Sequence, residues 1–165
     1  MWPGSACDRA GTGDRIGEAN VYNNLGYAYF CKGDLELAID HYMKRLEIAV
    51  ELKDLRGQAI TLNNIGDIFR KFGDCSRAIE LHEQVLEMQE QIGDRRRQAL
   101  TMNNLGLDHW TCGNWTKAID YFDKGLSLSK EIGDQQTEVN IAWNLGLIYE
   151  ELGDDERSQF NADAS

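Results

Sequence analysis

Features that would mark several other protein classes are scarce or missing in this chain. Proline occurs once among 165 residues, and no run of about 18 apolar residues is present, so no membrane-spanning helix is expected. The 4 cysteines form no CxxC pair and have no histidine at metal-ligand spacing, so no zinc site is expected. The first residues lack an apolar core of signal-peptide length. We therefore expect a cytoplasmic protein without a metal or cofactor.

Positive charge and catalytic motifs are also in short supply. The chain has 17 basic against 28 acidic residues, a net charge of −11, so neither nucleic acid nor an anionic membrane is an expected partner. The single basic run, Arg95-Arg96-Arg97, favours a solvated loop over a docking site for an acidic partner. Because there is no glycine-rich phosphate loop and no Ser-His-Asp set, an enzyme is not expected.

What the chain does contain is one four-residue block that recurs in register. Asn63-Asn64-Ile65-Gly66 has counterparts at steps of forty residues, each followed by a Gly-Asp or Gly-Asn turn. The counterparts are Asn23-Asn24-Leu25-Gly26, Asn103-Asn104-Leu105-Gly106 and Trp143-Asn144-Leu145-Gly146. An uninterrupted period in the range of about 20 to 50 residues is typical of a solenoid whose units stack on their neighbours.

Each period predicts two antiparallel helices, A and B, because apolar residues recur at helical spacing on either side of the Gly-Asp turn. The expected fold is all-α, with units at 14–53, 54–93 and 94–133 and a partial unit at 134–154. Residues 1–13 are expected to be a disordered tail. Ser158 and Gln159 replace the Ala-Ile pair that opens helix B elsewhere, so 155–165 are expected to form a short frayed helix or tail.

The repeated glycines of helix A also need a structural reason. A glycine inside a helix is less favourable than alanine by about 0.5 to 1 kcal/mol, so Gly26, Gly66, Gly106 and Gly146 indicate a close helix crossing. We expect the matching small residues to be the alanines of helix B, namely Ala38, Ala78 and Ala118.

The first unit, with Leu25, Gly26, Tyr29, Ala38 and Tyr42 at these spacings, resembles the tetratricopeptide repeat. The forty-residue step is similar to the variant found in LGN/Pins adaptors and kinesin light chains. This resemblance implies a right-handed superhelix of about three and a half repeats and no catalysis. It also implies a concave groove, lined by helices A, that receives a peptide.

The residues themselves predict a binding surface on the helix A face opposite the apolar stripe. Asparagine inside a helix is less favourable than alanine by about 0.5 kcal/mol, so a repeated asparagine needs a reason. A side-chain amide both donates and accepts hydrogen bonds, which suits the main chain of a bound peptide. The alternative is that the amides join neighbouring helices of the stack. We predict that the peptide is held by Asn24, Asn64, Asn104 and Asn144, with Asn23, Asn63 and Asn103 beside them.

Other residues on this face are expected to select side chains of the ligand. Trp110 and Trp143 are predicted to frame an apolar pocket, or alternatively to fill the seam between the third and fourth units. Apolar side chains of the ligand are expected to be selected by Tyr27, Leu107 and Leu147. The register of the ligand is expected to be set by the mixed charge of Asp67, Arg70 and Lys71.

The sequence thus predicts a protein–protein interaction module, the adaptor or sensor part of a signalling complex, that binds a peptide segment of a partner. The alternative function is an assembly element that self-associates through its incomplete C-terminal repeat, because the missing apolar stripe after Asp154 leaves the last helix A uncovered.

Overall fold

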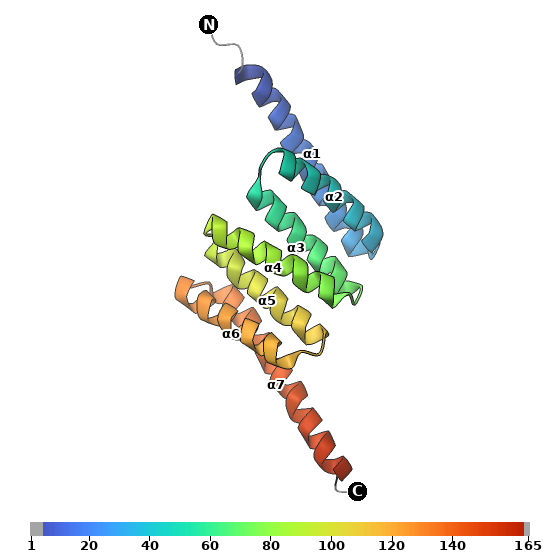
Figure 1. Cartoon of the computed structure of the whole chain (residues 1–165), viewed down its shortest axis with the longest axis vertical. Helices are drawn as coiled ribbons and strands as arrows, with labels where there is room; N and C mark the ends of the chain where they lie inside the picture. Colours follow the sequence, from blue (N-terminus) through green and yellow to red (C-terminus); the bar gives the residue numbers. More distant parts are fainter. Residues whose placement is uncertain (1–4, 164–165) are drawn as a thin grey trace. The chain divides into compact units, whose positions relative to one another are not determined.

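The computed structural model describes the backbone of residues 5–163 and the side chains of residues 13–153, and this part of the chain forms seven α-helices without a strand (Figure 1). Two compact units are distinguished, Met1–Ile92 and Gly93–Ser165.

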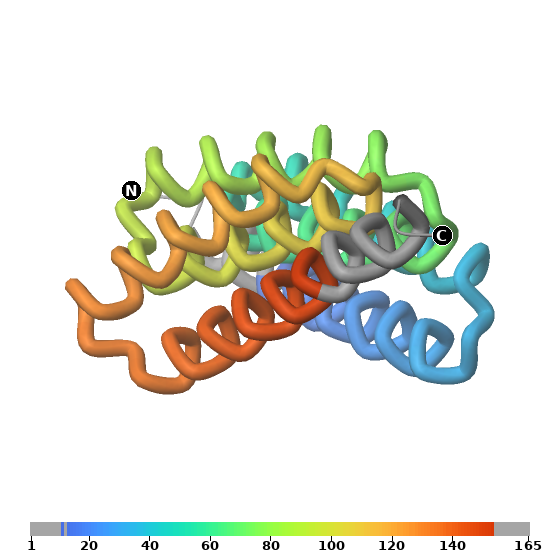
Figure 2. The backbone as a smooth tube through the Cα atoms, turned by 90° about the horizontal axis from the view of Figure 1, so that it is seen from below, coloured from blue at the N-terminus to red at the C-terminus, as the bar shows by residue number. Residues whose placement is uncertain are grey.

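The first unit consists of two helical hairpins. Its helices are α1 (Ser5–Lys32), α2 (Leu35–Glu51), α3 (Leu55–Lys71) and α4 (Cys75–Ile92). Helix α1 packs on α2, α3 packs on α4, and α2 also contacts α3. The second unit has one complete hairpin, α5 (Arg95–Thr111) with α6 (Trp115–Ile132), followed by α7 (Gln135–Asp163), which packs on α6 (Figure 2). The all-α expectation is confirmed.

The Gly-Asp and Gly-Asn turns act at helix junctions as their sequences predict. Gly33, Gly73 and Gly113 have φ values of +86°, +80° and +75°, a region that favours glycine because it has no Cβ. After two of these turns the polar residue caps the next helix: Asp74 Oδ1 accepts a hydrogen bond from the backbone N–H of Arg77 at 3.2 Å, and Asn114 Oδ1 accepts one from that of Lys117 at 3.3 Å. Asp34 makes no such side-chain bond.

In the three complete hairpins the helix A glycine meets an aromatic ring of helix B, and not the alanine that we expected, whereas Gly146 of α7 meets neither among the described residues. A Cβ added to Gly26 would lie 2.8 Å from the Tyr42 ring, and one added to Gly66 would lie 2.7 Å from the His82 ring. Gly106 faces the ring of Phe122 in the same way. The expected pairing with Ala38, Ala78 and Ala118 is therefore wrong. Those alanines are fully buried, but the space above each glycine is filled by the ring four residues later.

The cores of the two units rest on these hairpins. In the first unit, Ala38 and Tyr42 of α2 form a buried cluster with Ile65 and Ile68 of α3. In the second, Ala118 and Phe122 of α6 form one with the α7 residues Ile141, Leu145 and Ile148. Helices α2 and α6 therefore each pack between their own helix A and the helix A that follows within the same unit.

Both outer helices are longer than the sequence indicated. Helix α1 begins at Ser5, inside the stretch expected to be a tail, and α7 continues through Gly153-Asp154, where a turn was expected. The internal Gly-Asp turns precede an Ala-Ile pair that packs the next helix back onto the hairpin. After Asp154 that pair is absent, so little favours a turn over continued helix. Among the described helices, none is both long and apolar enough to cross a membrane.

Candidate functional site

The predicted asparagines lie on helices A of both units. Asn24 of α1 is exposed, whereas Asn64 of α3 is half-buried. Asn104 of α5 and Asn144 of α7 are also half-buried. The first members of the pairs, Asn23, Asn63 and Asn103, are half-buried as well.

In the second unit, two of these amides bond to each other. Asn144 Nδ2 of α7 donates to Asn103 Oδ1 of α5 at 2.8 Å. The first asparagine of one repeat is thus joined to the second asparagine of the next repeat. In the first unit the corresponding oxygen, Asn23 Oδ1, is buried without a hydrogen-bond partner among the described atoms. The repeated asparagines of helices A, which we call the asparagine column, therefore include a hydrogen-bonded pair, Asn103 with Asn144, and an acceptor without a partner among the described atoms, Asn23 Oδ1.

Asp67 is the centre of a polar cluster on α3. Its carboxylate forms an ion pair with Arg70 and accepts a hydrogen bond from Asn63 Nδ2 at 3.4 Å. His82 of α4 is fully buried, with Nε2 3.8 Å from Asp67 Oδ1 and 3.3 Å from the carbonyl oxygen of Asn63. The carboxylate is therefore held in place by its own chain, so it presents a fixed acceptor at this surface.

Two other predicted contact residues of the first unit lie on the exposed ends of helices A. Lys71 of α3 places its Nζ 4.1 Å from the centre of the Phe30 ring of α1, a cation–π contact. Tyr27 of α1 is exposed, and its hydrogen bond with the side chain of Cys31 raises the pKa of the Tyr27 hydroxyl.

The two predicted tryptophans line different hollows of the second unit. Trp143 is 70% exposed and, with Val139, Asn140, Asn144 and Asn103, lines a hollow of about 370 Å³. This hollow combines an exposed indole with three side-chain amides.

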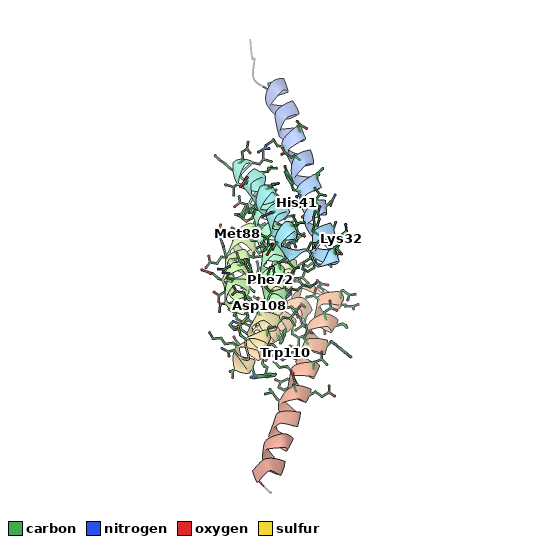
Figure 3. All side chains as sticks on the ribbon, turned by 90° about the vertical axis from the view of Figure 1, so that its right-hand side faces the viewer. Lys32, His41, Phe72, Met88, Asp108 and Trp110 are labelled. Carbon is green, nitrogen blue, oxygen red and sulfur yellow. The ribbon has the colours of Figure 1, made fainter. Side chains whose placement is uncertain are left out.

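Trp110 (labelled in Figure 3) is half-buried and lines a second hollow of about 370 Å³ with Leu147, Glu150 and Glu151. Its Nε1 donates to Glu151 Oε2 at 2.7 Å, and its ring packs against the core of the unit. Leu107, which is half-buried, packs against the same core.

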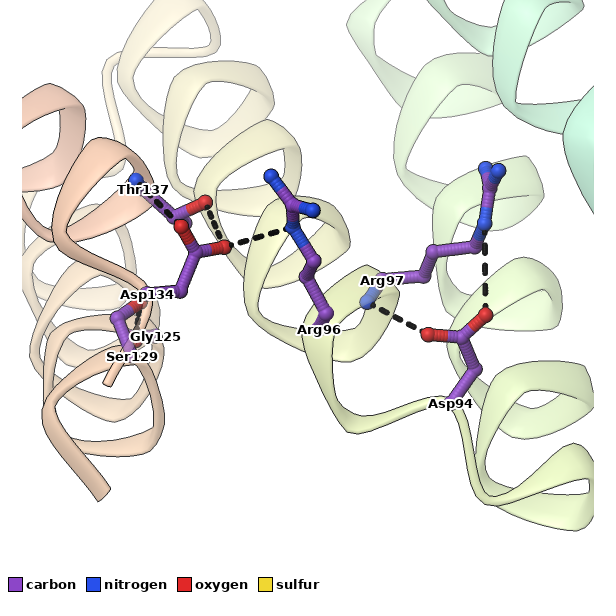
Figure 4. A network of polar contacts seen from close by, with 7 residues as sticks. All are labelled: Asp94, Arg96, Arg97, Gly125, Ser129, Asp134 and Thr137. Carbon is purple, nitrogen blue, oxygen red and sulfur yellow. Dashed lines mark hydrogen bonds and ion pairs between the residues drawn. The ribbon is translucent and has the colours of Figure 1, made fainter. Parts of the chain in front are cut away.

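The basic run at the start of α5 is matched by carboxylates of the same unit. Arg95 pairs with Glu131 of α6 at 2.8 Å, and Arg97 pairs with Asp94 at 3.4 Å. Arg96 Nε donates to Asp134 Oδ2 at 3.0 Å, and this carboxylate also accepts from Thr137 Oγ1 at 2.7 Å (Figure 4). The Thr137 hydrogen bond, assisted by Arg96, lowers the pKa of Asp134. The run is therefore largely neutralised within its own unit.

Sequence reasoning missed one polar site, at the α2–α3 junction. The Arg45 guanidinium donates to the carbonyl oxygen of Gly57 at 2.8 Å and also bonds Thr61 Oγ1. Burial lowers the pKa of Arg45. A signal did exist, because Thr61 and Thr101 recur in register where an apolar residue would otherwise fill the interior. Arg45 itself has no such recurrence.

Within the described side chains, no three His, Cys, Asp or Glu residues are grouped so as to hold a metal ion. The candidate residues are amides, aromatic rings and a few charged groups on helices A.

Solved structures with similar folds come from several kinds of protein. Aspartyl phosphate phosphatase F from Bacillus subtilis matches with a TM-score of 0.81 at 17% identity, covering 88% of this chain and 38% of its own. The TPR domain of Arabidopsis FLU matches with a TM-score of 0.66 at 18% identity, covering 71% of this chain and 98% of the domain.

A third solved structure is that of the Rap conjugation gene regulator of plasmid pLS20, in complex with the Phr* peptide. It has a TM-score of 0.76 at 16% identity and covers 93% of this chain and 43% of its own. The chain thus spans less than half the length of the phosphatase and of the regulator. At these identities the likeness concerns the fold alone. No curated protein matches the sequence.

The sequence pattern of the tetratricopeptide repeat matches residues 12–91 and 97–161, which is most of the chain. This match agrees with the helical hairpins and with the glycine-to-ring packing inside them. The chain is an all-α helical-repeat solenoid that belongs to the tetratricopeptide repeat family.

Proposed function

We propose that this protein is a protein–protein interaction module that binds a peptide segment of a partner along its helices A. The observation that carries the proposal is the hollow at Trp143, where an indole that is 70% exposed lies beside Asn103, Asn140 and Asn144. Exposed aromatic rings are frequent anchors at binding surfaces, and amides pair with peptide main chain of any sequence. A hollow lined mainly by amides and one ring suits a peptide better than a small charged substrate.

The asparagines serve two purposes in this proposal. Asn103 and Asn144 support each other across two helices, which positions the surface. Asn24, Asn64 and Asn104 contact the peptide main chain, while Tyr27 and Leu107 select side chains. Asp67 and Lys71 recognise charged side chains of the peptide.

Support for a peptide ligand also comes from one similar structure, since the regulator of plasmid pLS20 was solved with the Phr* peptide. The proposed partner is another protein, and this chain has the adaptor or sensor role within a cytoplasmic signalling complex.

A displayed peptide library, panned against the wild-type chain and an Asn64→Ala/Asn104→Ala variant, tests the proposal. The expected result is a set of peptides that enrich on the wild type and are lost on the variant. Thermal unfolding of both proteins is the control. If binding falls only in proportion to the loss of stability, the asparagines are structural and the proposal is wrong.

Self-association is the second candidate function. The observation that favours it is the exposed apolar surface of α7, where Val139 is 64% and Tyr149 56% exposed. Light scattering over a range of concentrations tests it, and a monomer whose mass does not change with concentration would contradict it.

A further inference from the structure

Gly146 of α7 lacks the glycine-to-ring contact of the complete hairpins. We call the space above such a glycine, which an aromatic ring of helix B fills, the glycine socket. The equivalent glycines, Gly26, Gly66 and Gly106, each face an aromatic ring of the helix B that follows. Around Gly146, no heavy atom of the described residues, apart from its chain neighbours and the nearby α7 backbone, lies within 4 Å of the position that a Cβ would take. In three hairpins of this chain an aromatic ring of helix B therefore packs over this position, and in the fourth repeat the described residues provide no such ring.

The residues that surround Gly146 are uncovered in the same way. In α5, Ala99 and His109 are buried and Met102 is half-buried. Their equivalents in α7 are Val139, Tyr149 and Ala142, all of which are exposed. We call Val139, Ala142, Gly146 and Tyr149 the α7 face. It occupies the positions that a helix B covers in each complete repeat.

Tyr149 shows what kind of residue its missing neighbour would be. In the first repeat the Tyr29 ring stacks on His41 of α2, with centroids 5.2 Å apart. In the third repeat the His109 ring stacks on Tyr121 of α6 at 5.4 Å. In both cases the stacked ring comes one residue before the ring that fills the glycine socket. An occupant of the α7 face thus presents two consecutive rings.

The chain's own C-terminal residues do not supply this pattern. Ser158 and Ala162 stand where Ala118 and Phe122 stand in the third repeat. The ring is therefore absent from the position that would reach Gly146. The backbone of these residues also continues α7 instead of turning back.

Charge narrows the chemistry of the occupant further. Glu150 takes the position of Trp110, whose ring lies 6.5 Å from that of Trp115 in α6. Trp115 precedes Ala118 by three residues. An occupant with Lys or Arg at that position would place a cation near the exposed Glu150 carboxylate. The acidic chain, with a net charge of −11, favours a basic segment in general.

We propose that the α7 face binds an amphipathic helix of a partner protein that completes the fourth hairpin. The helix carries alanine, then two aromatic residues three and four positions later, and a basic residue three positions before the alanine. A second copy of this chain is a poorer occupant. In the described residues, the alanine-to-ring spacing of helix B occurs in α2, α4 and α6, and each already covers its own helix A.

The test uses the sequence of α6, Trp115–Ile132, as a synthetic labelled peptide added to the intact chain. We expect the amide resonances of Ala142, Gly146 and Tyr149 to shift, and the Trp115→Lys peptide to bind about two- to fivefold more tightly at low salt. A Phe122→Ala peptide, which lacks the socket ring, is expected to bind at least tenfold more weakly.

Gly146→Ala in the chain separates docking from folding. The added methyl group would collide with a bound ring as it would at Gly26 and Gly66, so peptide affinity is expected to fall at least tenfold. The same change raises the Tm of the chain alone, because alanine is the better helix former. Gly17→Ala is the matched control, since Gly17 is a helical glycine whose added Cβ would likewise have no tertiary neighbour within 4 Å among the described residues. It is expected to raise Tm without changing affinity.

The proposal fails if the α6 peptide binds wild type and Gly146→Ala equally, if it does not bind, or if the shifts fall on α5 instead of α7. A dimer that forms through α7 and dissociates in the Gly146→Ala variant would identify a second copy as the occupant and would also overturn it. None of these outcomes depends on the asparagine column, so the peptide-binding proposal is tested separately.

Discussion

At the residue scale, the hairpins depend on the contact between a glycine and a ring. Interiors are close-packed, and a methyl group inserted into such a contact displaces a side chain or the backbone. The free energy of unfolding should therefore respond in opposite ways to the same substitution at covered and uncovered glycines.

Gly106→Ala is expected to lower the free energy of unfolding by about 1 to 3 kcal/mol, because the new methyl group overlaps the ring of Phe122. Urea unfolding followed by circular dichroism measures the change. Gly17→Ala, whose added Cβ has no tertiary neighbour within 4 Å among the described residues, is expected to raise the same quantity by about 0.5 to 1 kcal/mol. Equal effects at the two positions would show that the ring does not fill the socket.

The hydrogen bond between Asn103 and Asn144 gives a second residue-scale prediction. In a double-mutant cycle with alanine at both positions, we expect a coupling free energy of about 0.5 to 1.5 kcal/mol. Urea unfolding of the four proteins provides it. If the two single-variant changes in the free energy of unfolding simply add, the two amides do not interact in the folded chain, which would contradict this hydrogen bond.

At the scale of helices, ends and caps decide where each element begins. Asp134 lies directly before α7 and accepts hydrogen bonds from the Thr137 hydroxyl and N–H. Its lowered pKa means that the folded state favours the carboxylate. This stabilisation is complete above the unfolded pKa of about 3.9 and is lost as pH falls through the lower folded value.

Asp134→Asn removes the charge but keeps an acceptor, so it isolates this effect. We expect the Tm of wild type to exceed that of the variant at pH 7 and the difference to shrink towards pH 3. Calorimetry at several pH values measures it. A difference that stays constant with pH would contradict the assigned role of the carboxylate.

Lys53 gives a second prediction for a helix junction. It has a φ of +54°, whereas Gly93 and Gly133 hold the equivalent positions at +75° and +72°. A side chain is strained in this region, so Lys53→Gly is expected to raise the free energy of unfolding by about 0.5 to 1 kcal/mol. The reverse substitution, Gly93→Lys, serves as the control in the same urea experiment and is expected to lower it.

The helices of the complete repeats could be predicted from the sequence because turn chemistry and apolar spacing agree there. The residue that packs against the helix A glycine could not be predicted. Both Ala118 and Phe122 lie on the inner side of helix B, and only the packing decides which of them covers Gly106. The length of α7 was missed because a Gly-Asp pair ends a helix only when the next segment has a surface to pack against.

At the scale of the whole molecule, the chain is a repeat protein whose function depends on which surfaces its hairpins leave open. The asparagines were found from recurrence alone, yet recurrence cannot tell a structural amide from a ligand-binding one, as the Asn103–Asn144 bond illustrates. The exposed hollow at Trp143 needed the structure, since an indole at that position has no counterpart in the other repeats.

Hydrogen exchange with and without a peptide selected on the wild-type chain tests the central claim most directly. If helices A bind the peptide, protection is expected to increase in α1, α3, α5 and α7 at the asparagine positions, and to stay unchanged in α2, α4 and α6. Protection that appears in α2, α4 and α6 and spares the asparagine positions would show that the peptide binds elsewhere, and the proposed binding surface would be wrong.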